Sequence, residues 1–172
     1  MMKFFWIDME MTGLDVEKEV VIEVAAIITD NKLNPLDTYH AIVRQPQEFI
    51  DRMDDWNKRT HGESGLTALI PTGKDPAEVE KDLIALAEKH YQAKDRIILA
   101  GNSIGQDRLF VNKHFKRFAE RLHYRMLDVT SFKIVFNNMF QISYAKKVAN
   151  HRAIEDVQES INELKRYLEF VK

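Results

Sequence analysis

Two carboxylates stand one residue apart near the start of the chain, in the apolar stretch FFWIDMEMTGLD. Side chains of a β-strand alternate between its faces, so Asp8 and Glu10 would share one face, with Cα atoms about 6.5 Å apart. The two carboxylates would repel each other, and a divalent cation that prefers oxygen ligands, such as Mg²⁺ or Mn²⁺, would neutralise them. The pattern indicates a metal site, and the alternative is an exposed edge strand whose outer face is wet.

Three residues further along the chain could complete such a site. Asp107 follows the apolar run RIILAG and lies near the expected start of a helix, where an acid also complements the helix dipole. Asp156 lies in the first turns of the last expected helix, where an acidic side chain needs no function. His151 precedes it by five residues, so both can face one site only if His151 lies on the loop or cap before that helix. An imidazole with its ordinary pKa of about 6.5 suits a base at neutral pH.

The elements that would position these residues are strands first, then helices and strands in alternation. We expect strands over 3–11, 19–30 and 38–46, whose short connections favour antiparallel pairing. Strands are also expected over 96–101 and 124–129, and helices over 75–91, 105–122, 130–140 and 151–172. This order predicts an α/β fold with a mixed sheet flanked by helices.

Two of the expected helices carry strong local signals. The helix over 75–91 begins with Asp75 as N-cap, Pro76 at the first helical position and Glu78 three residues after the cap. The helix over 130–140 has either Thr130 or Asp128 as its cap. Apolar residues recur at helical spacing in the first and in the last helix, and these predict buried stripes: Val79, Leu83, Leu86 and Ala87, then Ile154, Val157, Ile161, Leu164 and Leu168.

Length and composition restrict the class of protein. The 172 residues suit one compact domain, and the net charge of −2 argues against tight binding to long duplex DNA. The chain has no cysteine, which excludes disulfides and fits a reducing cytoplasm. No stretch approaches the roughly 20 apolar residues of a membrane span. We therefore expect a cytoplasmic protein with no membrane partner.

The order of the acids and the histidine resembles the histidine-type DEDD exonucleases. Longer stretches are similar to the oligoribonuclease family in particular, from about residue 5 to residue 168: WIDMEMTGLD, MDDWNKRTHGESGL, AGNSIGQDRLF, HYRMLDVTSFK and HRAIEDVQESI. The resemblance implies a ribonuclease-H-like fold, in which three N-terminal antiparallel strands and further parallel strands form a mixed sheet flanked by helices. It also implies a single exonuclease domain over 1–172.

The same resemblance implies an activity. Asp8, Glu10, Asp107 and Asp156 match four acids that bind two divalent ions, Mg²⁺ or Mn²⁺, and His151 matches a general base. The family is a homodimeric 3′-to-5′ exoribonuclease that cuts very short RNAs, above all dinucleotides, to nucleoside monophosphates. This agrees with the chemistry of the acids, because two ions about 4 Å apart can clamp the attacking and leaving oxygens of a phosphodiester.

The family's substrate-binding residues also have counterparts. Leu14 matches a leucine that packs between the two bases, and such apolar contacts tolerate any base sequence. Trp56, for which core packing is the alternative, and His61 match residues near the scissile nucleotide. The remaining matches are an aromatic and a cation that reach the substrate across the dimer interface, and a cap around the 5′-phosphate: Tyr124 and Arg125, then Ser103, Arg125 and Thr130.

Two features depart from the family. Thr130 stands where the family often has serine, which keeps the hydroxyl, and the segment 136–150 lacks the usual Trp- and Pro-containing stretch. One alternative function is a broader exonuclease of the same superfamily that acts on longer RNA or DNA. Another is an inactive nucleic-acid-binding protein, which would have lost an acid or the histidine, whereas all five are present.

Overall fold

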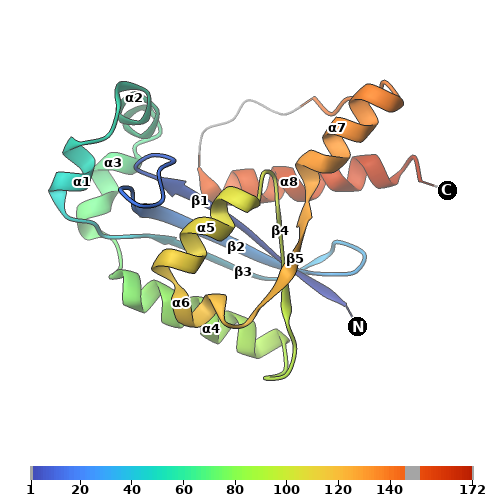
Figure 1. Cartoon of the computed structure of the whole chain (residues 1–172), viewed down its shortest axis with the longest axis horizontal. Coiled ribbons are helices and arrows are strands. Elements are labelled where there is room, and N and C mark those ends of the chain that lie inside the picture. The colour runs from blue at the N-terminus through green and yellow to red at the C-terminus, as the bar shows by residue number, and fades with distance from the viewer. Residues whose placement is uncertain (1, 146–151, 172) are drawn as a thin grey trace.

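A twisted five-stranded sheet forms the centre of the computed structural model, which describes residues 2–145 and 152–171 (Figure 1). Its strand order is β3-β2-β1-β4-β5, with these bounds: β1 Lys3–Met11, β2 Val21–Asp30, β3 Pro35–Ile42, β4 Ile97–Gly101 and β5 Leu122–Asp128. β1 pairs antiparallel with β2 and parallel with β4. The predicted mixed sheet and antiparallel N-terminal strands are therefore confirmed. Because β1 is the central strand, the exposed-edge alternative for Asp8 and Glu10 is wrong.

Helices cover both faces of this sheet (Figure 1). Their bounds are α1 Gln47–Asp51, α2 Asp55–Glu63, α3 Leu66–Leu69, α4 Pro76–His90, α5 Gly105–His114, α6 Lys116–Ala119, α7 Val129–Met139 and α8 Ala153–Leu168, with a 3₁₀ turn at Ile70–Thr72. No element was predicted for the segment that forms α1, α2 and α3. None of the helices within the described residues is long and apolar enough to cross a membrane.

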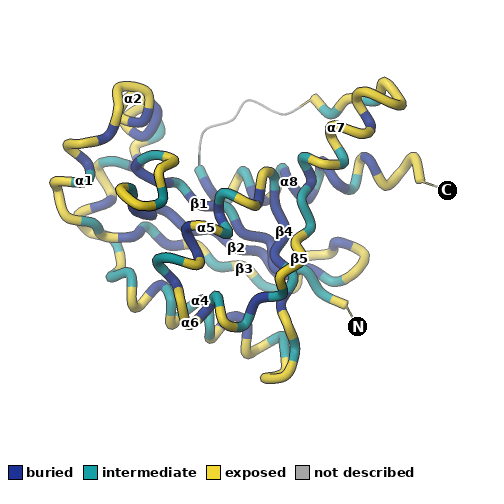
Figure 2. Tube along the Cα trace, in the orientation of Figure 1, coloured by how far each residue is buried: buried dark blue, intermediate teal, exposed yellow. Residues whose placement is uncertain are grey.

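The two faces of β1 belong to two different cores, as its alternating pattern requires. Phe5, Ile7, Met9 and Met11 pack with residues of α4, α5 and α6 on one face. Trp6 lies on the other face, in a core formed with residues of α7 and α8. The sheet is accordingly buried between helical layers, while α7 and the C-terminal end of α8 carry many exposed residues (Figure 2). Asp8 and Glu10 interrupt the second face.

The helix stripes were mostly predicted correctly. In α4 the buried residues are Val79, Leu83, Leu86 and Ala87, and the capping box of Asp75 and Glu78 is present. In α8, Val157, Ile161 and Leu164 are buried, but Leu168 is 42% exposed and Tyr167 is buried in its place. Asp128 caps α7 by accepting from the N–H of Thr130, which decides between the two predicted caps.

The continuous helix expected over 105–122 is wrong. It divides at Phe115, whose backbone leaves the helical region while its ring is buried in the core. Glu80 of α4 stabilises the break, since its Oε1 accepts from the N–H of Arg117 at 2.7 Å and caps α6. β5 then begins at Leu122. β3 was also predicted too late, because it begins at Pro35 and ends at Ile42.

Candidate active site

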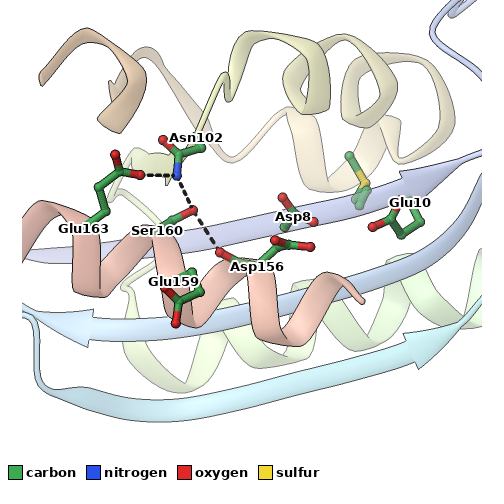
Figure 3. A pocket seen from close by; sticks show the side chains of 8 residues that line it. Asp8, Glu10, Asn102, Asp156, Glu159, Ser160 and Glu163 are labelled. Atoms are coloured by element: carbon green, nitrogen blue, oxygen red, sulfur yellow. Dashed lines mark hydrogen bonds between the residues drawn. The ribbon is translucent and has the colours of Figure 1, made fainter. Parts of the chain in front are cut away.

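Three of the predicted acids converge at the centre of the sheet. Asp8 and Glu10 project from β1, and Asp156 lies in the first turn of α8. One carboxylate oxygen from each can be chosen so that all three lie within 4.8 Å of one another, and all three residues are half-buried. Figure 3 shows these side chains pointing into one cavity of about 230 Å³, which Asn102, Ser160 and acidic side chains of α8 also line.

Close backbone packing beside the acids comes from a glycine at the end of β4. A Cβ on Gly101 would lie 2.9 Å from the carbonyl oxygen of Ile7, a distance that real side chains do not tolerate. The absence of a side chain lets β4 approach β1 directly next to Asp8. The chain then leaves β4 through Asn102 and Ser103, close to the acid cluster.

Asp107, the fourth predicted acid, approaches β1 from α5. It is 7% exposed, and its Oδ1 accepts from the N–H of Met9 at 3.0 Å, so it contacts the backbone between Asp8 and Glu10. Burial raises the pKa of Asp107 to about 7, and the charge of Asp128 adds to this against the hydrogen bond from Met9. A nearby divalent cation would act in the opposite direction and favour the carboxylate. Asp107 lines a second cavity of about 200 Å³ together with Asp8 and Glu10.

Exposed apolar groups form the wall of this second cavity. Leu14 is 76% exposed and Trp56, on α2, is 53% exposed, so the core-packing alternative for Trp56 is wrong. The amide of Gln106 donates to the carbonyl oxygen of Leu14 at 2.7 Å, which ties the Leu14 loop to α5. His61 is buried, and its Nε2 lies 3.0 Å from the carbonyl oxygen of Met11. Since a carbonyl can only accept, Nε2 carries the proton in that bond.

Ser103 and Thr130 lie together beside the acids. Their hydroxyl oxygens are 3.1 Å apart, and the N–H of Ser103 lies within hydrogen-bond distance of Thr130 Oγ1, 2.8 Å, and Asp128 Oδ1, 3.0 Å. Ser103 has a backbone φ of +49°, a conformation that residues other than glycine rarely adopt. The structure therefore brings two of the three predicted phosphate-cap residues into direct contact.

Tyr124 and Arg125 lie elsewhere, on the edge strand β5. Tyr124 is 75% exposed, its ring stacks on His123 at 4.5 Å, and the Arg125 guanidinium lies 5.2 Å from the Tyr124 ring centre. Within the described residues, neither side chain lines the two cavities at the acids. Among the described residues, Tyr124 and Arg125 contact His123 and each other, and no hydrogen bond joins their side chains to Ser103 or Thr130.

His151 lies outside the described residues. Its neighbour Arg152 is the N-cap residue of α8, which begins at Ala153. The Arg152 guanidinium binds Glu23 of β2, with Nε at 2.9 Å from Oε1. Glu23 is fully buried and also contacts His40 and the N–H of Ala153. Burial by itself would raise the pKa of Glu23, but these hydrogen bonds outweigh it and hold the pKa below its usual value.

Sequence reasoning missed Glu23, and also a set of polar residues behind the acids: Asn102, Ser160 and Glu163. In the sequence Glu23 is an isolated acid within an apolar strand, and only its buried partners distinguish it. Glu163 stands among other acids of the last helix, where an exposed position would be the usual reading. The one signal in the sequence was that Glu163 falls at a position of the helical repeat where a buried side chain is expected.

Comparison with known proteins agrees with this architecture. Residues 5–164 match the RNase_T exonuclease family. Exonuclease I from Methylocaldum szegediense superposes with a TM-score of 0.76 over 99% of this chain, at 15% identity, and this likeness shows the fold. The chain spans 41% of that protein's length. The fold and the acid cluster thus define an exonuclease domain of the ribonuclease-H-like class.

Sequence relatives identify the family within this class. Oligoribonuclease from Ectopseudomonas mendocina is 43% identical over 171 residues, covering 94% of this chain and 92% of that one. Mitochondrial oligoribonuclease from Mus musculus is 38% identical over 178 residues, covering 96% of this chain and 71% of that one. The chain belongs to the oligoribonuclease family, which confirms the predicted resemblance. Because a mitochondrial relative matches so well, the cytoplasmic location stays a prediction.

Proposed function

We propose that this chain is a 3′-to-5′ exoribonuclease that hydrolyses very short RNAs, especially 5′-phosphorylated dinucleotides, to nucleoside 5′-monophosphates. We also propose that residues 1–172 form one exonuclease domain. The observation that carries the proposal is the joint position of the acids Asp8 and Glu10 with the exposed side chains of Leu14 and Trp56 around one small cavity. A dinucleotide bound in this cavity could therefore contact the acids with its phosphodiester and the side chains of Leu14 and Trp56 with its bases.

The acids suit hard divalent cations. Asp8, Glu10 and Asp156 offer oxygen ligands within 4.8 Å of one another, and Asp107 approaches the same strand from α5. Carboxylate oxygens are the ligands that Mg²⁺ and Mn²⁺ prefer, and four carboxylates balance the charge of two such ions. When bound, two ions supply electrostatic stabilisation of the attacking and leaving oxygens.

The remaining steps belong to the protein's own side chains. His151 is proposed to take the proton from the attacking water, because imidazole is the side chain whose unperturbed pKa lies close to neutral pH. In this proposal Leu14 packs between the two bases, and Trp56 and His61 lie beside the scissile nucleotide. Contacts of this apolar kind select for nucleotide geometry and not for base identity, so the enzyme would accept many dinucleotide sequences.

A cap at the far end of the site would limit substrate length. Ser103 and Thr130 present two hydroxyls, and the Ser103 N–H is already held by Asp128 and Thr130. Arg125 would supply a charge-assisted contact to a terminal phosphate. A phosphate enclosed in this way leaves no path for a third nucleotide on its 5′ side, which is the physical basis of the proposed dinucleotide preference.

We also propose a homodimer in which a second copy presents Arg125 to this phosphate, because within the described residues Arg125 lines neither cavity at the acids. β5 is an edge strand, and edge strands with exposed apolar neighbours favour pairing with another chain. Exposed apolar side chains on the adjoining α7 and its end extend this surface: Ile134 at 58%, Met139 at 73% and Phe140 at 59%. Tyr124 and Arg125 on β5 would then enter the partner's site.

The test is a length series. The protein is incubated with 5′-phosphorylated RNAs of two to seven nucleotides, with Mg²⁺ or Mn²⁺, and nucleoside monophosphates are quantified against time. We expect the dinucleotide to be cleaved fastest and EDTA to abolish cleavage. Equal rates at every length would contradict the dinucleotide preference and favour the broader exonuclease. If the protein cleaved DNA oligonucleotides but not RNA oligonucleotides, the ribonuclease assignment would be contradicted.

A further inference from the structure

A chain of hydrogen bonds joins α8 to the loop that follows β4. Glu163 is 5% exposed; its Oε1 accepts from the hydroxyl of Tyr167 at 2.8 Å and its Oε2 from the amide of Asn102 at 3.1 Å. The same amide nitrogen donates to Ser160 Oγ at 3.0 Å, and Ser160 Oγ donates to the backbone carbonyl of Asp156 at 2.9 Å (Figure 3). Asn102 is thus connected to the helical turn that carries Asp156.

These partners fix which way the Asn102 amide faces. A carboxylate only accepts hydrogen bonds, so the NH₂ group of Asn102 must point toward Glu163. Its carbonyl Oδ1 then faces the opposite side, where the hydroxyl of Thr130 donates to it at 3.4 Å. Thr130 Oγ1 in turn accepts from the N–H of Ser103 at 2.8 Å. The orientation set by α8 is therefore passed to the Ser103–Thr130 pair.

The backbone at Ser103 needs this support. Its φ of +49° costs free energy for a residue with a Cβ, and such a conformation persists where the surrounding structure over-determines it. The N–H of Ser103 is held by Asp128 and Thr130. Asn102, the residue directly before it, is held by Glu163 and Ser160. The strained residue is therefore anchored at its own N–H and through the side chain that precedes it, and one of the anchors is α8.

We propose that Asn102 is a positioning residue that couples α8, and with it Asp156, to the 5′-phosphate contacts of Ser103 and Thr130. Its correct amide orientation, imposed by Glu163, sets the geometry in which the two hydroxyls meet a terminal phosphate. The inference rests on the proposed function, because it concerns selectivity for a 5′-phosphate. It assigns to Glu163 the role of orienting Asn102.

The polarity of the pair gives a sharp test. Asn102→Asp keeps the shape of the side chain but places a second carboxylate against Glu163, and two buried like charges repel. Adding Glu163→Gln to the same chain restores the hydrogen bond with its direction reversed: the amide at position 163 now donates, and the carboxylate at position 102 accepts. In this double variant the Tyr167 hydroxyl can still donate to the amide oxygen at position 163. Asn162→Asp on α8 is the matched control. Among the described residues, the side chain of Asn162 forms a hydrogen bond only with Gln158.

The first measurement is kcat/KM for one RNA dinucleotide with and without its 5′-phosphate. We expect Asn102→Asp to lower the preference for the phosphorylated form at least tenfold, through KM of that form. The double variant should recover most of the preference, and Asn162→Asp should leave it unchanged. If Asn102 had a purely structural role, Asn102→Asp would lower kcat/KM for both substrates alike, and the double variant would not restore the preference.

The second measurement needs no substrate. Hydrogen exchange of the Ser103 amide and of the first turn of α8 should speed up at least tenfold together in Asn102→Asp and slow again in the double variant. Unchanged exchange, or an unchanged phosphate preference in Asn102→Asp, overturns the proposal. If the unmodified protein itself shows no phosphate preference, the proposed function fails at the cap, while the exchange data still decide whether Asn102 couples the two elements.

Discussion

Replacement of Glu23 by glutamine should destabilise the protein strongly, although the change is isosteric. Glu23 is fully buried on β2 and accepts from Arg152, from the N–H of Ala153 and at 2.6 Å from His40. Glutamine removes the charge and turns an NH₂ group toward at least one of these donors. Breaking a buried ion pair from one side costs about 3–5 kcal/mol.

The lower end of that range applies, because the partners are not fully buried. The side chains of Arg152 and His40 keep 24% and 34% of their exposure, so water would partly solvate them once the carboxylate is gone. For a chain of this length, about 3 kcal/mol corresponds to a decrease in Tm of roughly 6–12 °C. Thermal denaturation followed by circular dichroism at pH 7 measures it, with Glu155→Gln on the exposed side of α8 as the control.

The pH dependence provides an independent check. The pKa of Glu23 in the folded protein lies below its ordinary value of 4.5, so its ionised form stabilises the fold above that pH. This stabilisation is lost as the pH falls through the folded pKa. The difference in unfolding free energy between Glu23→Gln and the unmodified protein should therefore be constant near neutrality and shrink below pH 4.5. A decrease of less than about 0.5 kcal/mol at pH 7, typical of a surface substitution, would refute the reasoning.

Three further predictions concern the proposed site. Asp8→Asn should reduce kcat by at least about a hundredfold, the scale for removing one preorganised electrostatic group, and should abolish any rise in Tm caused by Mn²⁺; cleavage at the unmodified rate would contradict the metal role. Leu14→Ala should raise KM for a dinucleotide about tenfold with kcat little changed, as base contacts of 1–3 kcal/mol require, and an unchanged KM would exclude Leu14 from base binding. Ile134→Glu with Met139→Glu should convert a dimer into monomers by sedimentation velocity and lower activity, and fully active monomers would contradict a shared site.

Local rules account for the parts of the fold that the sequence predicted well. The alternation in β1 placed Asp8 and Glu10 on one face, and period and caps located α4 and the core positions of α8. The same rules failed where a distant residue decides. The helix break at Phe115 depends on Glu80, 35 or more residues earlier in the chain, and no local pattern reports that contact.

The site divides in the same way. The acids were recognisable because their order along the chain is conspicuous and each falls at an element's predictable position. The exposure of Trp56 was not predictable, because a tryptophan at the start of a helix can face the core or the solvent with the same local sequence. Glu163 and Asn102 were missed because their role lies in a hydrogen bond between α8 and the loop that follows β4, and only the packed fold brings these two segments together.

The position of the buried acids explains how a chain of net charge −2 can be suited to an anionic substrate. Glu23 lies on β2 against the start of α8, and Glu163 lies on α8 itself. Each is satisfied by donors from the protein: Arg152 for Glu23, and Asn102 and Tyr167 for Glu163. Asp8, Glu10 and Asp156 line the cavity, and each places one carboxylate oxygen within 4.8 Å of the others. Carboxylates of the first kind stabilise the helix, whereas a bound divalent cation would favour the close approach of those of the second kind. In the proposed function, positive charge for the phosphate would come from bound ions at one end of the substrate and from Arg125 at the other, so the surface as a whole need not be basic.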